Sequence, residues 1–487
     1  MTASENVTTR SMPTPSVPDS RMPRLANVPA FTEYMSKGWG TPDRTPPVVA
    51  GAAAAAGVHR GRASEQFPGK ALVVGAGIAP VRSNDTYYDF RPDSDFYWLT
   101  GAAIEGAVLV MTPSGSSHDA TLYIPAPFYA DDPRFFTNAA HGEMWVGSAP
   151  DFTDWAEALS LPVKPLSELD AGIIAAMRAG SETLAAGLVP ADVRSRHGIA
   201  AGDLGRVLSN LRMVKDDWEI AQLKEAVDHT VDGFAAVVRE VPNAIKAGGE
   251  RWLQGTFDRY ARTHGNGVGY ATIVGSGKHA PTLHWVRCDG PVLEDATLLL
   301  DMGVETNSFY TADVTRTFPG SGTFSPLQRQ VHDLVEKSHR AGLAQVGPGK
   351  YFADFHEACM EVIANGLNDW GLLPVSVDEA LSPKGQHHRR YLVCGVGHHL
   401  GLDCHDCAQS SYESYQGAPM VPGMVLTVEP GLYFHEHDLT LPPELRGIGV
   451  RLEDDIVVTA TGSDVISDAL PLDATGIEAW MKLVQQG

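Results

Sequence analysis

Short apolar stretches alternate with turn residues from Phe67 to about residue 200. Apolar runs of four to eight residues between turns are typical of strands. The runs that we assign to strands are Ala71 to Val74, Phe96 to Leu99, Ala107 to Met111 and Thr121 to Ile124. We therefore predict a mixed α/β N-terminal domain over residues 66–205.

A helical repeat of apolar residues begins after residue 215. Asp216 and Glu219 have the spacing of a capping box, which marks a helix start. The apolar positions that follow at helical spacing are Ile220, Leu223, Val227 and Val231. We predict that this helix opens a second domain over residues 206–487.

The second domain is predicted to combine helices with an antiparallel-rich sheet, which makes it α+β. Pro326 suits the first position of a helix, and the Gly-Pro-Gly sequence at 347–349 ends it. A partner helix carries Phe355, Cys359, Val362 and Ile363 on one face. Strand-like segments lie at residues 296–304, 309–318, 424–428 and 449–458.

Residues 1–65 show no sustained apolar period. They mix Pro, Ser and Thr with an alanine run from Ala52 to Ala56. A segment of this composition offers little apolar surface to bury. We expect residues 1–65 to be a disordered or loosely packed extension without catalytic residues.

Charge and hydropathy exclude two kinds of partner. The formal net charge of −22 opposes binding to nucleic-acid phosphates. No apolar run approaches the roughly 20 residues of a membrane span, and the N-terminus lacks the pattern of a signal peptide. The 5 cysteines are an odd number without framework spacing, as expected of reduced thiols. We predict a cytoplasmic protein with neither nucleic-acid nor membrane partners.

Two aspartates in a predicted hairpin are the first candidate site residues. Asp301 follows three leucines, where a buried carboxylate is costly unless it has a partner. If the hairpin turns about Asn307, Asp313 lies opposite Asp301, with Cβ atoms about 4.5–5.5 Å apart. Two like charges that close need a cation. The alternative from the hairpin alone is a pair of solvent-facing acids.

Further charged residues occupy apolar surroundings near the C-terminus. Glu429 ends the stretch VLTVE, Arg451 and Glu453 share one face of an apolar strand, and His398 follows a glycine-bearing turn. Four carboxylates and one neutral imidazole form a donor set suited to Mn²⁺, Co²⁺ or Zn²⁺. The four negative charges also match two divalent ions, with a bridging hydroxide as an additional anion.

The order Asp, Asp, His, Glu, Glu in these motifs resembles the M24 metallopeptidases, the creatinase or pita-bread superfamily. The long N-terminal region is similar to that of aminopeptidase P or prolidase rather than methionine aminopeptidase. The resemblance covers nearly everything after residue 65. Besides the ligand motifs, it is carried by NDTYYDFRPDSDFYWLTG at 84–101, LRMVKDDWEI at 211–220 and IVGSGKHAPTLHW at 273–285.

The resemblance implies an aminopeptidase P-like N-terminal domain, then a pita-bread catalytic domain that holds two divalent ions, with Mn²⁺ first and Co²⁺ or Zn²⁺ as alternatives. It implies hydrolysis of the N-terminal Xaa-Pro bond of peptides by a metal-bridged hydroxide, and a homo-oligomer, either a dimer or a tetramer. The implied metal ligands are Asp301, Asp313, His398, Glu429 and Glu453, with Asp313 and Glu453 bridging.

The expected mechanism assigns roles to a few further residues. We expect His405, and second to it His284, to donate hydrogen bonds to the oxyanion, and Glu429 to transfer protons. His284, Cys394, His405 and Arg451 are the candidate substrate contacts. Cys394 stands where many relatives have a histidine, which puts the contacts at that corner in question.

Two alternatives to the predicted function remain open. A prolidase would use the same chemistry on Xaa-Pro dipeptides only. A non-catalytic binding module on the same fold is disfavoured by the complete ligand set, as is a metal-free hydrolase. A further departure is that Asp301 and Asp313 are 12 positions apart, one more than the familiar pattern.

Other signals are assigned no catalytic role. Gly75-Ala76-Gly77 lacks the third glycine of a dinucleotide fingerprint, and Cys404 with Cys407 lacks a second pair for a zinc site. We interpret these thiols as core or chance cysteines, and His387-His388 as part of a solvated basic stretch. For Trp145 two readings stay open: a core residue, or part of a loop that reaches a neighbouring subunit's active site, as the resemblance implies.

Overall fold

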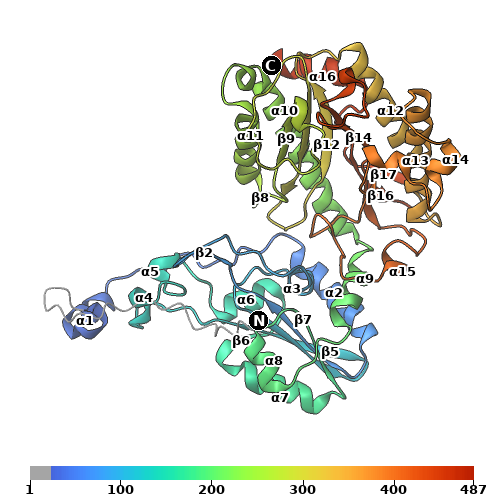
Figure 1. Cartoon of the computed structure of the whole chain (residues 1–487). Coiled ribbons are helices and arrows are strands. Elements are labelled where there is room, and N and C mark those ends of the chain that lie inside the picture. The colour runs from blue at the N-terminus through green and yellow to red at the C-terminus, as the bar shows by residue number, and fades with distance from the viewer. Residues whose placement is uncertain (1–23, 487) are drawn as a thin grey trace. The chain divides into compact units, whose positions relative to one another are not determined.

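The computed structural model describes residues 24–486 and divides the chain into two compact units, residues 1–208 and 209–487. Figure 1 shows the elements of both units, coloured along the chain. Each unit has its own core and is described by itself. The predicted domain boundary after residue 205 lies close to this division.

A five-stranded mixed sheet forms the centre of the first unit, in the order β6-β5-β4-β1-β7. The strand β1 pairs antiparallel with β4 and parallel with β7, and every residue of β1 is buried. The bounds of the sheet strands are β1 Ala71–Ala76, β4 Val108–Ser114, β5 Ser117–Ile124, β6 Val163–Pro165 and β7 Thr183–Leu188. A separate hairpin consists of β2 Val81–Ser83 and β3 Thr86–Tyr87.

Helices surround this sheet. Ile173 and Ala176 of α7 join Val73, Val108 and Val110 of the sheet in one buried cluster. The helices are α1 Pro29–Met35, α2 Ala52–Gln66, α3 Ser94–Thr100, α4 Arg134–Thr137, α5 Glu143–Val146, α6 Phe152–Leu159, α7 Leu169–Ala179, α8 Ala191–His197 and α9 Leu204–Arg212, the last of which continues across the division between the units. The predicted mixed α/β character of this unit is confirmed.

The strand predicted at Phe96 to Leu99 is wrong, because these residues lie in α3. The side chain of Asp93 caps this helix by accepting hydrogen bonds from the backbone N–H groups of Asp95 and Phe96. Gly101 ends it in the left-handed conformation. All seven residues of α3 are buried, so the segment has no polar face from which a helical period could be read.

The prediction of a loosely packed extension is wrong for residues 52–65. The alanine run begins α2, in which Ala52, Ala55 and Ala56 are buried. His59 of the same helix stacks on Trp98 with ring centroids 4.2 Å apart. Small side chains allow the close approach of α2 to α3, and alanine also has the highest helix propensity. Residues 1–23 lie outside the described part of the chain.

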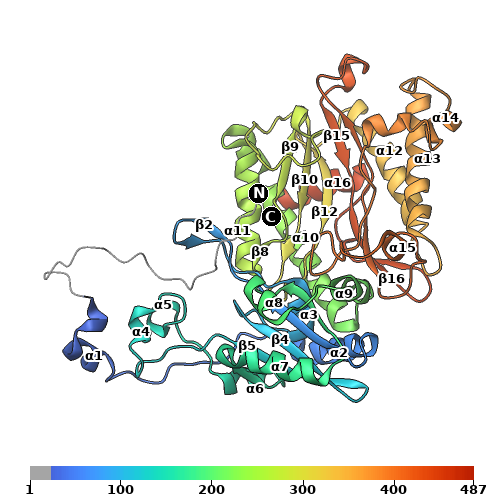
Figure 2. The ribbon, with the colours of Figure 1, turned by 60° about the horizontal axis from the view of Figure 1, so that its bottom comes forward.

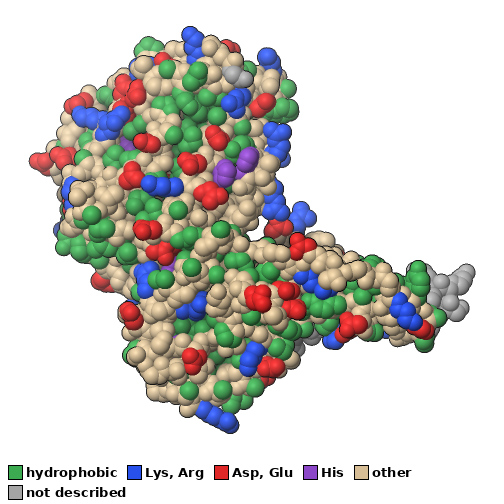
Figure 3. Space-filling view, turned by 180° about the vertical axis from the view of Figure 1, so that it is seen from behind, with side chains coloured by type: hydrophobic (Ala, Val, Ile, Leu, Met, Phe, Trp, Pro, Cys, Tyr) green, Lys and Arg blue, Asp and Glu red, His purple; other side chains and the backbone are tan. Residues whose placement is uncertain are grey.

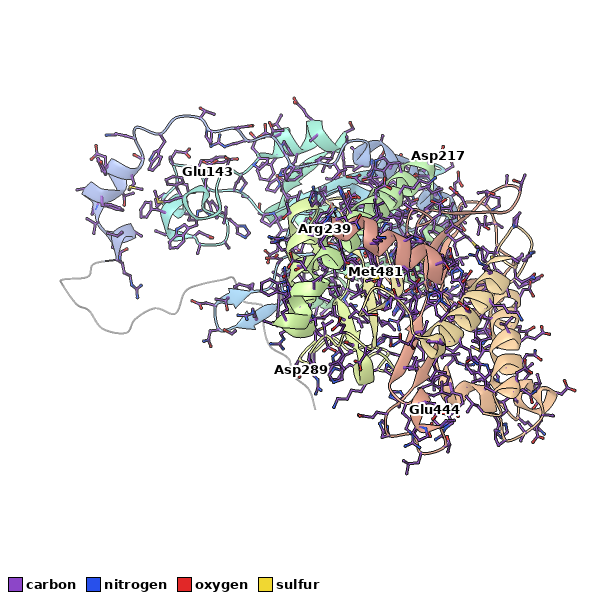
Figure 4. The ribbon with its side chains drawn as sticks, turned by 90° about the horizontal axis from the view of Figure 1, so that it is seen from above. Glu143, Asp217, Arg239, Asp289, Glu444 and Met481 are labelled. Carbon is purple, nitrogen blue, oxygen red and sulfur yellow. The ribbon has the colours of Figure 1, made fainter. Side chains whose placement is uncertain are left out.

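The second unit holds its strands between two pairs of helices. Figures 1 and 2 agree that α10 and α11 lie on one side of the strands and α12 and α13 on the other. The main sheets have the orders β12-β10-β9 and β13-β16-β17, with the pairs β14-β15 and β11-β8 beside them. In Figure 4, Arg239 of α10 and Met481 of α16 mark two helices in contact. This layered arrangement is the predicted α+β class.

The strands of the second unit are β8 Gly267–Val268, β9 Ile273–Ser276, β10 Thr297–Met302, β11 Val304–Glu305, β12 Val314–Pro319, β13 Val425–Val428, β14 Gly431–Phe434, β15 Ile448–Arg451, β16 Asp454–Val458 and β17 Ser463–Val465. The helices are α10 Asp217–Lys246, α11 Gly249–His264, α12 Pro326–Leu343, α13 Phe352–Asp369, α14 Val377–Leu381, α15 Tyr412–Tyr415 and α16 Ala474–Gln486. Two predicted strands are each split, 296–304 into β10 and β11, and 449–458 into β15 and β16. None of the helices in the described residues is long and apolar enough to span a membrane.

Local signals predicted the helix starts correctly. Asp216 and Glu219 form the capping box of α10, and Ser325 caps α12 directly before Pro326. In α13, Phe355, Cys359 and Ile363 are buried. These contacts depend on residues at most four positions apart, which is why the sequence alone reveals them.

The alternation of side chains along β10 determines on which face of the sheet Asp301 lies. Leu298 and Leu300 pack into the core beneath α10 and α11, whereas Leu299 packs into the core on the opposite face. Successive side chains of a strand point to opposite faces, so Asp301 points to the same face as Leu299, two positions earlier. The carboxylate of Asp301 therefore lies on the face opposite α10 and α11.

Candidate metal centre

The hairpin between β10 and β12 has a different register from the predicted one. Asp301 pairs with Thr315, not with Asp313. The chain between the strands is irregular over residues 309–313, where Phe309 adopts a positive φ of 65°. Asp313 precedes Thr315 by two positions and so lies diagonally from Asp301 on the same face. Both aspartates thus point into one site, although the assumed direct opposition is wrong.

Thr315 joins the hairpin to the segment that carries Glu453. The backbone N–H of Glu453 donates to the carbonyl of Thr315 at 3.0 Å, and the Thr315 hydroxyl donates to Glu453 Oε2 at 2.7 Å. Asp301, Thr315 and Glu453 therefore form a row across neighbouring segments. The importance of Thr315 was not visible in the sequence, because it depends on the register.

His398 and Glu429 come from two segments that are themselves hydrogen-bonded. The backbone N–H of Thr427 donates to the carbonyl of His398, and that of Glu429 donates to the carbonyl of Val396, each at 2.9 Å. These bonds align the chain before His398 with the end of β13. As a result the imidazole and the carboxylate of Glu429 face each other, with His398 Nε2 3.6 Å from Glu429 Oε1.

The predicted ligands meet in one cluster, in which Asp301, Asp313 and Glu453 are buried and His398 and Glu429 are half-buried. Asp313, His398 and Glu453 each offer a ligand atom within 4.8 Å of the others. His398 Nε2 lies 3.3 Å from Asp313 Oδ2. Burial raises the pKa of Asp301, and the charge of the nearby Asp313 raises it further. All five predicted ligands therefore come together from segments as far apart as residues 301 and 453.

The carboxylates of this cluster raise the pKa values of one another. Burial raises the pKa of Glu453 well above its ordinary value, and the charges of Asp313, Glu429 and Asp301 raise it further. Burial likewise raises the pKa of Glu429 to about 7, although His398 and Arg451 oppose the shift. Carboxylates packed this closely are stable only with protons or cations between them. The oxygen-rich donor set with one imidazole fits divalent transition-metal ions.

Arg451 is a buried partner of the cluster. Its guanidinium donates to Asp301 Oδ2, to the Thr315 hydroxyl at 3.0 Å and to the Tyr433 hydroxyl at 3.0 Å. Tyr270 donates to the other oxygen of Asp301 at 2.6 Å. The two tyrosines were not predicted as site residues, because no sequence signal marks them. The predicted contact of Arg451 with substrate stays a prediction.

His284 and His405 lie at the open side of the cluster, and both are exposed. The His405 ring packs edge-on against the His398 ring, with centroids 4.4 Å apart. Burial lowers the pKa of His405, and the nearby His398 and His284 lower it further. The structure thus places His405 beside the predicted ligand His398, and His284 within electrostatic reach of His405.

The cysteines of the region differ from one another. The thiol of Cys404 donates to Asp313 Oδ2 at 3.0 Å, a contact beside the site that the interpretation as a core or chance thiol did not anticipate. Cys407 is buried beside Asp406. Cys394 is half-buried, and its pKa is raised by burial and by the charge of Glu429. Cys394 is thus within electrostatic reach of Glu429, and its predicted contact with substrate stays a prediction.

Two discounted signals are also resolved. His388 is buried, with Nδ1 2.8 Å from the carbonyl of Ala380, and Arg389 donates to the carbonyls of Leu392, Val393 and Cys394. The interpretation of this stretch as solvated is therefore wrong at His388, whereas Arg389 is partly exposed. Trp145 is 56% exposed, so it is not a core residue.

Charged side chains are mixed over the surface. On the face in Figure 3, acidic and basic side chains are interspersed, and the basic ones do not gather into one patch. The chain has a net charge of −22, and this face carries no single basic patch.

Comparison with known proteins places both units. Residues 221–460 match the metallopeptidase family M24, and residues 58–185 match the aminopeptidase P N-terminal domain. The Xaa-Pro aminopeptidase 2 of Streptomyces coelicolor is 44% identical over 459 residues, which is 93% of this chain and 96% of the relative. The Xaa-Pro aminopeptidase of Escherichia coli is 31% identical over 85% of this chain and 94% of its own length.

Solved structures agree with the sequence relatives. Aminopeptidase P from E. coli with the inhibitor Pro-Leu has a TM-score of 0.78 and 28% identity to this chain, and covers 89% of this chain and 99% of its own. The aminopeptidase PepP of Pseudomonas aeruginosa gives a TM-score of 0.77 at 25% identity. The resemblance and the pita-bread fold are thereby confirmed. The chain belongs to the M24 metallopeptidases, with an aminopeptidase P N-terminal domain ahead of its pita-bread domain.

Proposed function

We propose that this protein is an Xaa-Pro aminopeptidase that requires two divalent metal ions and removes an N-terminal residue preceding proline. The observation that carries the proposal is the meeting of buried Asp301, Asp313 and Glu453 with half-buried His398 and Glu429. Relatives that match 93% and 85% of this chain are named Xaa-Pro aminopeptidases.

The five clustered residues would hold the ions, with Asp313 and Glu453 as the bridging ligands. Glu453 suits a bridge because three other ligand carboxylates act on its pKa. When bound, divalent ions supply Lewis acidity that polarises a carbonyl and lowers the pKa of a bound water. We propose Mn²⁺ as the ion, with Co²⁺ and Zn²⁺ as alternatives from the same donor chemistry.

Glu429 is the proposed proton-transfer group. Its side chain is 19% exposed, compared with 7% for Asp313 and 9% for Asp301, so its carboxylate is more open to the substrate side. A carboxylate in this position takes a proton from the attacking water and delivers it to the leaving proline nitrogen. Asp301 is held instead by Arg451 and Tyr270 and is the more rigid ligand.

His405 and His284 would stabilise the oxyanion that forms when the scissile carbonyl is attacked. A neutral imidazole donates one N–H, and the lowered pKa of His405 favours the neutral form. Preorganised donors of this kind act most strongly where charge develops in the transition state. Their exposure at the edge of the cluster leaves room for a peptide.

Peptide length is the point on which a prolidase would differ. A dipeptide brings a free carboxylate next to proline, whereas a longer peptide brings an uncharged amide. The Cys394 thiol stays neutral, because burial and Glu429 raise its pKa, and a thiol is a weak donor. We therefore favour longer peptides over dipeptides, with prolidase activity as the second candidate.

The remaining assignments are a cytoplasmic location and a homo-oligomer. All five cysteines are free, which fits a reducing compartment. Met144, Trp145 and Val146 of α5 are exposed, which suits a contact with another subunit.

Metal analysis combined with a peptide series tests the proposed function. We expect about two divalent ions per chain, cleavage of Xaa-Pro-Yaa peptides, and no cleavage when alanine replaces the proline. Full activity after chelation and dialysis would refute the metal requirement, and a preference for dipeptides would favour prolidase.

A further inference from the structure

The segment that carries Cys404 and His405 lacks regular secondary structure. It extends from the end of the His398 motif to residue 411, outside any helix or strand. A side chain on such a segment is not positioned by a ladder of backbone hydrogen bonds. Other contacts must therefore fix His405 beside His398, where the ring centroids are 4.4 Å apart.

Asp406, the next residue, is buried between two basic side chains. The guanidinium of Arg212 donates to Asp406 Oδ1, and the ammonium of Lys215 donates to Oδ2 at 2.9 Å. The side chains of Lys215 and Asp406 are each 1% exposed. Arg212 also donates to Asp403 at 2.8 Å, so two carboxylates meet two cations. We call Arg212, Lys215, Asp403 and Asp406 the clamp.

The clamp acts on backbone that has little freedom to move. The backbone N–H of Asp406 donates to the carbonyl of His399 at 2.9 Å, which closes the segment into a loop. A Cβ on Gly401 would lie 2.3 Å from Asp406 Oδ2, so the carboxylate packs directly against this glycine. Cys407 has a positive φ of 62°, a conformation that costs energy for a non-glycine residue. The contacts of Asp406 thus sustain a strained loop.

His405 and Asp406 face opposite ways. His405 is exposed toward the site, and Asp406 is buried in the clamp. Anchoring one side chain of such a pair therefore fixes the direction of the other. Arg212 is the last residue of α9, and Lys215 lies just before α10. Both residues belong to the second unit, so the loop is fastened to the chain that leads into α10.

We propose that Asp406 is a positioning residue, which holds His405 over the metal centre through its ion pairs with Arg212 and Lys215. This inference rests on the proposed function, because it assigns the placement of the oxyanion donor. Asp406 touches neither the substrate nor the ligand atoms. Its influence on turnover passes through His405.

Charge, rather than size, is what the clamp requires. A carboxylate presents an acceptor oxygen to each cation, whereas an asparagine presents one oxygen and turns an N–H₂ group toward the other cation. Removing one partner of a buried pair leaves an uncompensated charge. The loop that carries His405 should therefore shift in the Asp406→Asn variant. Displacing a catalytic group by about 1 Å can lower the rate about 10²-fold.

The test is a double-mutant cycle on hydrolysis of an Xaa-Pro-Yaa peptide, using Asp406→Asn, His405→Ala and both together. We expect Asp406→Asn to lower kcat at least tenfold, with KM changed less than about twofold and two metal ions retained. In the His405→Ala background the same change should have almost no further effect, because its route to the reaction is already gone. Equal losses of kcat in both backgrounds would overturn the inference.

Two controls keep a folding defect apart from a positioning defect. Val335→Ala removes buried volume from α12, away from the clamp, and should lower the thermal midpoint without lowering kcat below about half. If Asp406→Asn does not fold, Lys215→Gln replaces it, since the Arg212 pair then remains, and the same dependence on His405 is expected. If the single variants Lys215→Gln and Asp406→Asn both fold and both keep the wild-type kcat, the inference is also overturned. A wild-type protein inactive on every Xaa-Pro peptide would refute the proposed function instead.

Discussion

Two buried groups of charges in the second unit have opposite balances. The metal centre gathers four carboxylates around His398, with Arg451 as the basic partner of Asp301. The clamp sets Asp403 and Asp406 against Arg212 and Lys215. A surplus of buried carboxylates requires protons or added cations, whereas a balanced set pairs its charges within the chain. Charge balance therefore separates a site that binds ions from a site that holds structure.

The largest effect should follow from removing a bridging carboxylate. Glu453→Ala should lose both ions together and reduce peptide hydrolysis to background. The reason is that Glu453 is one of the two proposed bridging ligands, and Asp313 would be the only one left. Metal content by mass spectrometry measures this directly. The exposed Glu444→Ala is the matched control and should keep two ions and full activity. Two ions retained by Glu453→Ala would remove Glu453 from the bridging role.

Breaking the clamp should cost stability rather than metal. Asp406→Asn leaves buried cations uncompensated, and such a loss costs about 3–5 kcal/mol. Arg212 and Lys215 hold the pKa of Asp406 far below its usual range, so its contribution is present above the unfolded value of 3.8 and is lost as the pH falls below that value. The difference from wild type in urea unfolding should be constant from about pH 8 to 5 and shrink below about pH 4. A difference that grows with acid would contradict the assignment.

His405→Ala should lower kcat roughly 10²-fold while the metal content stays at the wild-type value. The side chain donates to the developing oxyanion and is not counted among the ligands. His284→Ala, the matched comparison, should have a smaller effect of the same kind. Loss of ions from His405→Ala would make His405 a ligand.

The smallest effect is expected at Cys394. Cys394→His supplies a stronger donor near Glu429, so the ratio of kcat/KM for Xaa-Pro dipeptides to that for Xaa-Pro-Yaa peptides should rise by a few-fold, about 1 kcal/mol. Matched dipeptide and tripeptide pairs measure the ratio. Cys359→Ser, in the buried face of α13, controls for the loss of another thiol. An unchanged ratio would remove Cys394 from substrate selection.

The sequence predicted the parts of this account that depend on local chemistry. The capping box at Asp216 and the helix start at Ser325-Pro326 follow from neighbouring residues, and the five proposed ligands stand out as polar or charged residues in apolar stretches. The hairpin register could not be predicted, because it depends on the irregular chain around Phe309. The helix α3 was not predicted, because all of its residues are buried and no polar face reveals a helical period.

Long-range contacts account for the other omissions. Lys215 and Asp406 are separated by 191 positions, and no spacing rule links them. Cys404 was dismissed from its spacing to Cys407, whereas its relevant neighbour is Asp313. Thr315 became recognisable only when the register placed it between Asp301 and Glu453. A fold is needed before such partners can be paired.

The central claim is tested most directly by titrating the chelated, metal-free protein with Mn²⁺ while following hydrolysis of an Xaa-Pro-Yaa peptide. Activity should be absent at the start, rise with added ion and level off at about two ions per chain. Full hydrolysis before any ion is added, or saturation with no ion bound at the five ligands, would contradict the account.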